Sequence, residues 1–462
     1  MKPRELRNLG LPQGDALKAA TRACADARLP RDELRTLIRA LIADPATFVD
    51  HPEFGTVASM MVQSASSPPP MVLRETPAPW RQWGEDLDPA SVQQLADACS
   101  LPISVRGALM PDAHLGYGLP IGGVLATDNA VIPYAVGVDI ACRMKLTVLD
   151  IPTTALHGQT DRLVNAIESE TRFGIGAKFD SPHAHDVMDD DWTISPVTAR
   201  FKDKAWQQLG SSGSGNHFVE FGELTLEQSE LGLDPGTYLA LLSHSGSRGV
   251  GAQVANHYSR IAMERHPDLP KSLRHLAWLS LDDEAGAEYW AAMTLMGAYA
   301  AANHAVIHAS IAKHLGARVM ADVENHHNFA WKETHDGRDV IVHRKGATPA
   351  GDGVLGIIPG SMASPAYVVR GTGSDDALHS ASHGAGRMMS RRQARSSLTW
   401  SDARRLLRER NVHLISAGLD EVPFVYKSIE DVMASQDDLV RVIARFDPRI
   451  VKMAPEGERP ED

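Results

Sequence analysis

The chain has 462 residues, of which 43% are hydrophobic and 23% are charged, and its formal net charge at pH 7 is −12. This composition is typical of a soluble globular protein with two or three domains, or one large domain with an appendage, and the charge argues against a protein that coats nucleic acid non-specifically. The N-terminus is too polar for a signal peptide and no apolar run is long enough to span a membrane, so a cytoplasmic location is expected. Three cysteines are too few for a disulfide framework.

Helical periodicity dominates the first 63 residues. Apolar residues recur at three- and four-residue spacing in segments 14–29 and 30–44, and Pro30 and Asp32 are typical helix-start residues. The Ser- and Pro-rich segment 64–70 then breaks the pattern and indicates a linker. Residues 1–70 are therefore predicted to form a small all-helical extension, and residues 71–462 the main domain.

The pattern after residue 71 changes to short apolar runs that end in glycine-rich loops, each of which predicts a buried strand. Four segments show it: 131–141, 237–249, 339–350 and 354–362. A long helix is predicted over 285–316, with an apolar stripe that faces the core. Because strands and helices alternate irregularly, the predicted class is mixed α and β without a doubly wound sheet.

The first chemically suggestive motif is "GVDIACRM", which follows the glycine-rich run "MPDAHLGYGLPIGG". Asp139 and Cys142 are three residues apart, so on a tight turn both side chains can face one point. A carboxylate and a thiolate there can ligate a divalent metal. The alternative is a core cysteine beside an aspartate that caps a turn.

Further polar motifs occur later in the chain. The loop "LGSSGSGNHFVEF" offers backbone amides and His217 but lacks the ending of a phosphate-binding P-loop, so a polar hairpin loop is the alternative. "SHSGSRGVG" places His244 and Arg248 in a similar setting, which suits an anion. In "ENHHNFAWKE" only one of the two adjacent histidines can face inward on a strand. Arg344 and Lys345 in "HRKGATPA" can contact phosphates or form a solvated basic turn.

Together these motifs supply one aspartate, one cysteine and three histidines at strand ends, which is a ligand set for two metal ions bridged by a thiolate. The glycine-, serine- and arginine-rich loops suit a polyphosphate. His383 in "SASHGAGRMMSRR" is then a candidate nucleophile, since an imidazole nitrogen can attack phosphorus. The small residues 384–386 would let a nucleotide lie against the backbone. Arg387 is the expected phosphate contact there, whereas Arg391 and Arg392 are interpreted as solvated or as guides for RNA.

The motifs resemble, closely and in order, those of the RtcB family of RNA-splicing ligases. The matching blocks are "MPDAHLGYG", "IPYAVGVDIACRM", "GSGNHFVEF", "HSGSRGVG", "HHNFAWKE", "HRKGA", "IPGSM" and "SASHGAGRMMSR". The similarity covers roughly residues 77–453. The resemblance implies an α+β fold of packed β-sheets surrounded by helices, with the catalytic domain in 71–462. It also implies two manganese ions (Mn²⁺) bridged by Cys142, with these ligands: Asp139, Cys142, His217, His244 and His327.

The resemblance further implies a GTP-dependent RNA ligase. His383 would be guanylylated, and an RNA 3′-phosphate or 2′,3′-cyclic phosphate end would be joined to a 5′-hydroxyl end, as in tRNA splicing or RNA repair. The implied nucleotide pocket comprises Asn216, Phe218, Glu220, His327, Asn328, Pro359, Gly360, Ser361, Met362, His383, Gly384, Ala385 and Gly386. The phosphate or RNA contacts are Arg248, Arg344, Lys345 and Arg387. The resemblance is also compatible with an activating protein partner and with a monomeric or a dimeric state.

The chain departs from the family pattern around the base. Ala363 and Ala366 stand where the pattern has glycine and serine, and Ala454 stands near the position of a C-terminal lysine, with Lys452 two residues earlier. Two alternatives therefore stay open. One is a divergent paralogue that uses the same metals and histidine for nucleotidyl transfer or RNA-end phosphate hydrolysis. The other is a non-catalytic RNA-end binding protein that docks through its N-terminal helices.

Overall fold

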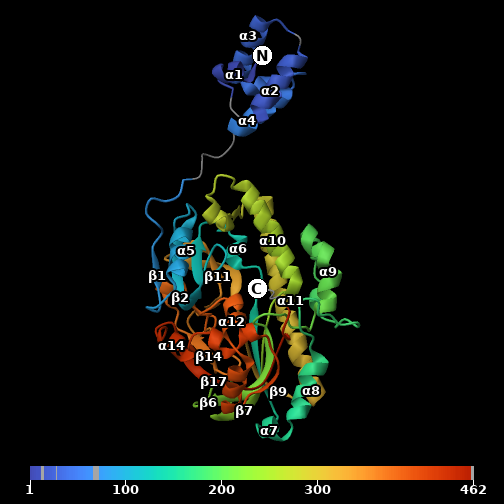
Figure 1. Cartoon of the computed structure of the whole chain (residues 1–462), viewed down its shortest axis with the longest axis vertical. Helices are drawn as coiled ribbons and strands as arrows, with labels where there is room; N and C mark the ends of the chain where they lie inside the picture. The colour runs from blue at the N-terminus through green and yellow to red at the C-terminus, as the bar shows by residue number, and fades with distance from the viewer. Residues whose placement is uncertain (12–14, 28, 66–71, 459–462) are drawn as a thin grey trace. The chain divides into compact units, whose positions relative to one another are not determined.

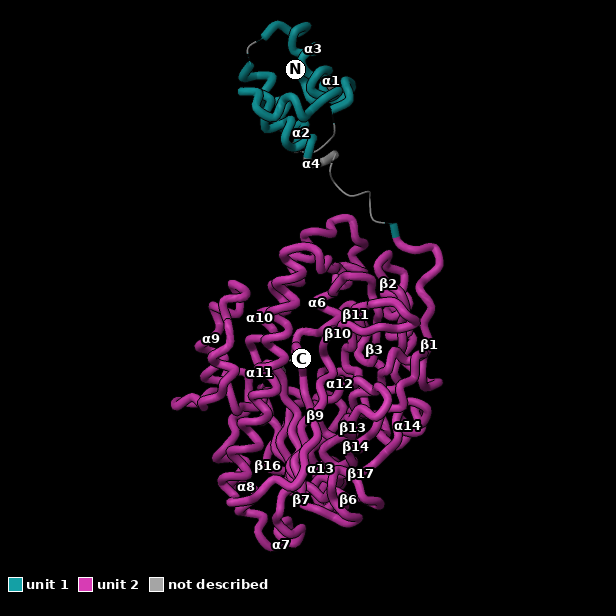
Figure 2. Tube along the Cα trace, turned by 180° about the vertical axis from the view of Figure 1, so that it is seen from behind, with its two compact units in different colours: residues 1–72 teal, residues 73–462 magenta. Residues whose placement is uncertain are grey.

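The computed structural model describes residues 1–11, 15–27, 29–65 and 72–458 (Figure 1). The chain divides into two compact units, Met1–Val72 and Leu73–Asp462, which Figure 2 shows in different colours. No helix within the described ranges is long and apolar enough to cross a membrane.

The first unit is all-helical, as its periodicity predicts. Its helices are α1 (Pro3–Asn8), α2 (Asp15–Asp26), α3 (Arg31–Ala43), the 3₁₀ turn η1 (Pro45–Phe48) and α4 (Gly55–Ala65). Leu6, Ile38, Leu41 and Phe54 are fully buried in one apolar core. Because α4 continues through Ala65, the linker predicted from residue 64 is wrong for its first two residues, and residues 66–70 lie outside the described ranges.

The second unit contains a five-stranded sheet in which one pair of strands is parallel and the others are antiparallel. In spatial order its strands are β1 (Trp80–Gln82), β2 (Ser104–His114), β3 (Ile121–Thr127), β11 (Arg338–Lys345) and β10 (Asn328–His335). Asp336 and Gly337 join β10 to β11 with φ values of 51° and 73°, so the Asp-Gly pair makes the tight hairpin turn that this dipeptide favours.

A larger, eight-stranded sheet carries most of the polar motifs. Its main path runs β13 (Leu355–Pro359), β14 (Ala366–Gly371), β17 (Val440–Met453), β6 (Phe218–Leu226), β7 (Gly236–Ser245), β5 (Arg143–Leu149) and β9 (Val319–His326), and β16 (His413–Ser416) pairs with β17. The two ends of this path approach each other, because the backbone amide of Ile357 on β13 donates to Asn325 Oδ1 on β9 at 2.9 Å. The sheet therefore curls almost closed.

Helices surround these sheets, so the second unit is α+β as predicted. They are α5 (Pro89–Cys99), α6 (Pro133–Val136), α7 (Ala155–Gly158), α8 (Thr160–Glu170), α9 (Pro196–Gln208), α10 (Arg248–Arg265), α11 (Glu284–Leu315), α12 (Arg391–Ser397), α13 (Trp400–Glu409) and α14 (Ile429–Ala434). The 3₁₀ turns are η2 (Asp186–Met188), η3 (Trp192–Ile194), η4 (Lys271–Leu276), η5 (Asp375–Ala377), η6 (Leu419–Glu421) and η7 (Pro423–Val425). Two short pairs complete the unit: β12 (Ala347–Pro349) with β15 (Ser380–Ser382), and β4 (Ala130–Val131) with β8 (Leu279–Ser280). Helices α8 to α11 gather on one side of the unit (Figures 1 and 2).

Residues 131–141 do not form the single buried strand predicted from their composition. β4 ends at Val131, and Pro133 begins the one-turn helix α6. Proline suits the first turn of a helix because its missing N–H would have no partner there. Gly137, at φ 104°, ends the helix. The other three predicted strands are confirmed as β7, β11 with β12, and β13, and the predicted helices as α2, α3 and α11.

Candidate active site

The predicted metal ligands lie at one end of four neighbouring strands of the large sheet. β6 and β5 begin there, directly after His217 and Cys142, whereas β7 and β9 end there with His244 and before His327. The register places Phe218 opposite His244 and Arg143 opposite His326. Because β6, β7, β5 and β9 are adjacent, ligands far apart in the sequence come together.

The five side chains form two groups that share one cysteine. Asp139, Cys142 and His217 offer ligand atoms that all lie within 4.8 Å of one another, and so do Cys142, His244 and His327. Cys142 Sγ lies 3.0 Å from His244 Nε2 and 3.5 Å from His217 Nε2. His217 Nε2 lies 3.0 Å from Asp139 Oδ2, and the Nε2 atoms of His244 and His327 are 3.1 Å apart. This is the arrangement expected of two metal ions bridged by a thiolate.

Ligand groups must be unprotonated to bind a metal, and the surroundings of His244, His327 and Asp139 favour that form. Burial lowers the pKa of His244 to about 3 and holds the pKa of His327 well below its usual range. Burial alone would raise the pKa of Asp139, but the hydrogen bond and charge of His217 outweigh it and lower that pKa. Two neutral imidazoles and an ionised carboxylate are therefore the stable forms at neutral pH.

The turn that carries Asp139 and Cys142 is fixed by the backbone. Cys142 N donates to Asp139 O at 3.3 Å, Ala141 takes φ 56°, and Ala141 N donates to Asn328 O at 2.7 Å. The side-chain amide of Asn328 donates to Asp139 O at 3.2 Å. A Cβ at Gly246 would lie 2.0 Å from Asp139 Oδ1, so glycine is required there for the carboxylate to occupy its place.

A buried amide on α11 supports the two loops that carry further ligands. Asn303 Oδ1 accepts from Gly210 N at 2.7 Å, and Asn303 Nδ2 donates to Ser211 O at 2.9 Å and to Ser245 Oγ at 3.2 Å. These bonds join the loop before His217 to the end of β7. Asn216 O lies 3.1 Å from His244 Nδ1 and accepts its proton, which leaves Nε2 of that ring toward Cys142.

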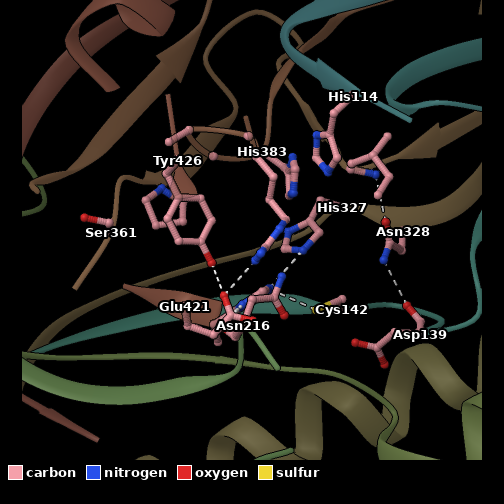
Figure 3. Close-up of a pocket in the computed structure, with 18 of the residues that line it drawn as sticks. His114, Asp139, Cys142, Asn216, His327, Asn328, Ser361, His383, Glu421 and Tyr426 are labelled. Atoms are coloured by element: carbon pink, nitrogen blue, oxygen red, sulfur yellow. Dashed lines mark hydrogen bonds and ion pairs between the residues drawn. The ribbon is translucent and has the colours of Figure 1, made fainter. Parts of the chain in front are cut away.

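His383 lies beside this cluster and is oriented by a buried carboxylate (Figure 3). Its ring centre is 5.0 Å from that of His327. His383 Nδ1 donates to Asp112 Oδ2 at 2.6 Å, and the same oxygen accepts from the backbone amides of His383 and Gly384 at 3.1 and 3.3 Å. Asp112 is fully buried. Because an ionised carboxylate only accepts, Nδ1 carries the proton and the lone pair of Nε2 is available.

The family model described as "tRNA-splicing ligase RtcB" matches residues 94–194 and 183–453 of this chain. The chain belongs to the RtcB family. It is 32% identical to the RNA-splicing ligase RtcB of Escherichia coli K12, with 79% of this chain and 95% of that protein covered. The tRNA-splicing ligase RtcB of Thermococcus kodakarensis is 30% identical over 78% of this chain and 90% of its own length. The RNA-splicing ligase RtcB of Mycobacterium tuberculosis is 33% identical, with 77% and 98% covered.

One large pocket of this RtcB-family chain lies over the candidate metal ligands and His383. It contains eighteen of the residues selected from the sequence: Asp139, Cys142, Asn216, Phe218, Glu220, His244, His327, Asn328, Lys345, Pro359, Gly360, Ser361, Met362, His383, Gly384, Ala385, Gly386 and Arg387. His217 lies behind this wall against Asp139. In Figure 3, Ser361 and Tyr426 lie on one side of His383, and His114 and Asn328 lie on the other.

Two of the four predicted phosphate contacts bind protein groups away from the pocket. Arg248 is buried, and it donates to Ser211 Oγ at 3.0 Å and to Gly174 O at 2.8 Å. Arg344 is also buried and donates to both carboxylate oxygens of Glu333, at 2.6 and 3.1 Å. Each therefore contributes to the support of a loop.

The other two predicted phosphate contacts line the pocket. Lys345 Nζ donates to Tyr117 O at 2.6 Å, and burial lowers its pKa to about 7. Arg387 donates to Glu421 Oε2 at 3.0 Å and to Asp420 O at 2.9 Å. Both side chains lie within the wall that a bound anion would face.

The glycines that follow His383 have different roles. Gly386 takes φ 73°, and a Cβ there would lie 2.1 Å from Asp112 O, so only glycine fits against the strand that carries this aspartate. Gly384 faces the pocket, and a Cβ there would lie 3.2 Å from Pro359 O. Ala385 is buried in the core. The absence of a side chain at Gly384 therefore lets a ligand lie against the backbone there.

Phe218 and Glu220 on β6 and Val451 and Met453 on the paired strand β17 line one part of the pocket wall. Burial raises the pKa of Glu220 well above its usual range. Lys452 does not replace the family's C-terminal lysine, because its Nζ pairs with Glu168 at 3.1 Å outside the pocket.

Sequence reasoning missed several residues of this site. Asp112 and His114 stand in the motif "MPDAHLGYG", and their spacing of two would have placed both on one face of a strand. Tyr117 stands in the same motif. Glu421 and Tyr426 also line the pocket, but no local pattern marks them.

Proposed function

We propose that this chain is an RNA ligase that joins an RNA 3′-phosphate or 2′,3′-cyclic phosphate end to a 5′-hydroxyl end through a nucleotidylated His383. The proposal rests above all on one observation. Two groups of buried ligands share Cys142, and they adjoin a histidine whose Nε2 lone pair is directed by Asp112. RNA- and tRNA-splicing ligases named RtcB are 30–33% identical to it over most of its length.

The ligand set fits two manganese ions. Asp139, Cys142 and His217 would hold one, and Cys142, His244 and His327 the other. Such ions, when bound, neutralise charge on a transferring phosphoryl group. The five protein ligands are already converged, and His244, His327 and Asp139 are unprotonated, so little reorganisation is needed to bind the ions.

In the first step His383 Nε2 attacks the α-phosphorus of GTP. The N–P bond forms as the bond between the α-phosphorus and the bridging oxygen breaks, and pyrophosphate leaves. The proton on Nδ1 stays in its hydrogen bond to Asp112, whose negative charge stabilises the positive charge that develops on the ring. Arg387 and the protonated form of Lys345 line the same pocket and supply positive charge near the phosphates.

Two further transfers complete the ligation. A 2′,3′-cyclic phosphate is first opened by water to a 3′-phosphate. An oxygen of that phosphate then attacks the phosphorus on His383, which breaks the N–P bond and leaves GMP joined to the RNA end. Finally the 5′-hydroxyl of the second RNA attacks the 3′-phosphorus, loses its proton, and displaces GMP.

GTP is the proposed nucleotide, and the altered base pocket favours a second candidate. Ala366 and the absence of Lys452 from the pocket remove polar partners that the family pattern supplies. A lost partner to a base edge costs about 1–3 kcal/mol of discrimination. A paralogue that uses another nucleotide, or that hydrolyses RNA-end phosphates, would keep the same ligands and His383.

Nucleotide labelling tests the proposal. The chain is incubated with manganese and each of the four ribonucleoside triphosphates labelled at the α-phosphorus, and the labelled peptide is mapped. We expect acid-labile label from GTP on wild type and on the control His157→Ala, which changes an exposed histidine, and none on His383→Ala. A preference for another nucleotide would favour the paralogue, and equal labelling of His383→Ala would exclude His383 as the nucleophile.

A further inference from the structure

An arginine-rich surface is formed by α12 and α13 in this otherwise acidic chain. The segment from Arg387 to Arg410 contains eight arginines and only two acidic residues, Asp402 and Glu409, so its formal charge is +6 (8 − 2). The whole chain carries −12. Positive charge is therefore concentrated in the segment that directly follows His383.

Helix α13 packs against the outer side of the pocket wall. Its buried residue Leu407 belongs to one apolar cluster with Met362, Val451 and Met453, which themselves line the pocket. Figure 2 shows α13 beside β16 and β17. The opposite face of the helix is exposed and carries Arg404, Arg405 and Arg408, with Arg410 just beyond its end.

Four of these arginines have no carboxylate partner within 4.0 Å among the described residues: Arg392, Arg404, Arg408 and Arg410. By contrast, Arg395 pairs with Asp420 at 2.9 Å. Arg405 pairs with Asp402 at 3.1 Å. Arg404 and Arg408 also lie one helical turn apart, and like charges at this spacing destabilise a helix slightly. An external anion would remove that repulsion.

We propose that these four arginines, the α12–α13 arginine group, bind the phosphate backbone of the RNA strand whose end enters the pocket. This rests on the proposed function, which brings an RNA end to His383. The guanidinium fork matches phosphate geometry, and the segment holds eight arginines and no lysine. α13 is about 15 Å long at 1.5 Å per residue, long enough to follow more than one phosphate. Its contact with the pocket wall favours RNA over an acidic protein as the occupant.

The test compares Arg404→Gln/Arg408→Gln with a control, Arg200→Gln/Arg260→Gln, on α9 and α10, which contribute no residue to the pocket. Binding of single-stranded RNA with a 3′-phosphate is measured by fluorescence anisotropy between 50 and 300 mM salt. For single strands each phosphate contact contributes about 0.7 to the slope of log affinity against log salt. We expect the slope to fall by about 1.4 and affinity at 0.1 M salt to fall about 25-fold.

The same variant separates RNA binding from chemistry. We expect its RNA-free labelling at His383 to equal that of wild type, its KM for RNA to rise and its kcat at saturating RNA to stay unchanged. An affinity and slope equal to the control's would refute the arginine group as an RNA site and leave it a solvated face or a protein-binding surface. Loss of labelling would also refute it, because the arginines would then act through the pocket wall.

Where the double variant fails to fold, Arg408→Gln alone should lower the slope by about 0.7. Since binding is measured without nucleotide, failure of wild-type labelling would refute the proposed function separately.

Discussion

Asp112→Asn removes the charge that orients His383 while keeping the size of the side chain. Asp112 Oδ2 accepts from His383 Nδ1 at 2.6 Å and from two backbone amides. An asparagine offers a neutral oxygen, or turns its NH₂ group toward the ring. In the second case His383 must carry its proton on Nε2, the nitrogen that we propose attacks phosphorus.

The expected loss follows from the bond that is weakened. A hydrogen bond to a charged group contributes about 1.5–3 kcal/mol, and about 1.4 kcal/mol corresponds to a tenfold change in rate. Nucleotidylation of His383 in Asp112→Asn should therefore be about 10- to 150-fold slower than in wild type. The rate is measured as single-turnover labelling at saturating GTP and manganese.

The control for this experiment is Asp190→Asn, which changes an exposed aspartate. Circular dichroism melting reports whether each variant is folded. If folded Asp112→Asn is labelled within about twofold of the wild-type rate, then the carboxylate does not orient the nucleophile and the reasoning fails.

Three further predictions follow from the same structure. Cys142→Ala should lose both bound metal ions because both ligand groups use this thiolate. If Cys142 does not bridge the ions, elemental analysis of the variant after dialysis would show two ions retained. Burial alone would raise the pKa of Glu333, but the hydrogen bond from His335 and the charge of Arg344 lower it to about 2 from 4.5. Its stabilisation, about 3 kcal/mol, is then present above pH 4.5 and lost as pH falls through 2, so the stability difference between wild type and Glu333→Gln in denaturant titrations should shrink over that range; a constant difference would contradict this. Residues 73–462 form a compact unit, so a chain truncated to them should label His383 at the full-length rate, and a labelling rate more than tenfold lower would show that the helical unit takes part in the chemistry.

The candidate metal ligands were predictable because each lies beside a short apolar run, either just before it, as His217 does, or at its end, as His244 does. These runs form adjacent strands of one sheet, so residues at the same end of neighbouring strands lie close together. His217 and His244 contact Cys142 for this reason. The sequence also indicated that only one of His326 and His327 can face inward. In the structure His327 meets the cluster, and the ring of His326 lies 4.9 Å from that of Phe329.

The roles of the arginines were not predictable from local patterns. Arg248 and Arg344 stand in glycine-rich motifs that suit phosphate, yet both are buried against protein carbonyls and hydroxyls. Whether an arginine faces a ligand or a loop depends on which carbonyl groups tertiary packing leaves without backbone partners. The strand predicted over 131–141 failed for a related reason. Its apolar content reflects burial, and Pro133 and Gly137 decide the backbone.

The structure gives Arg344 a position that bears on His383 although it does not line the pocket. It donates to Ser380 Oγ at 2.8 Å and to Leu378 O at 2.8 Å, and Leu378 takes φ 51°. The strand that begins at Ser380 leads directly to His383, whose backbone amide is held by Asp112. His383, the proposed nucleophile, is therefore held both by the buried guanidinium of Arg344, which binds the chain before it, and by the buried carboxylate of Asp112 beside it. Holding the ring and the chain before it keeps a reactive nitrogen within the narrow range of positions that in-line attack requires. Arg344 therefore acts by supporting the chain that carries His383 and does not contact the substrate.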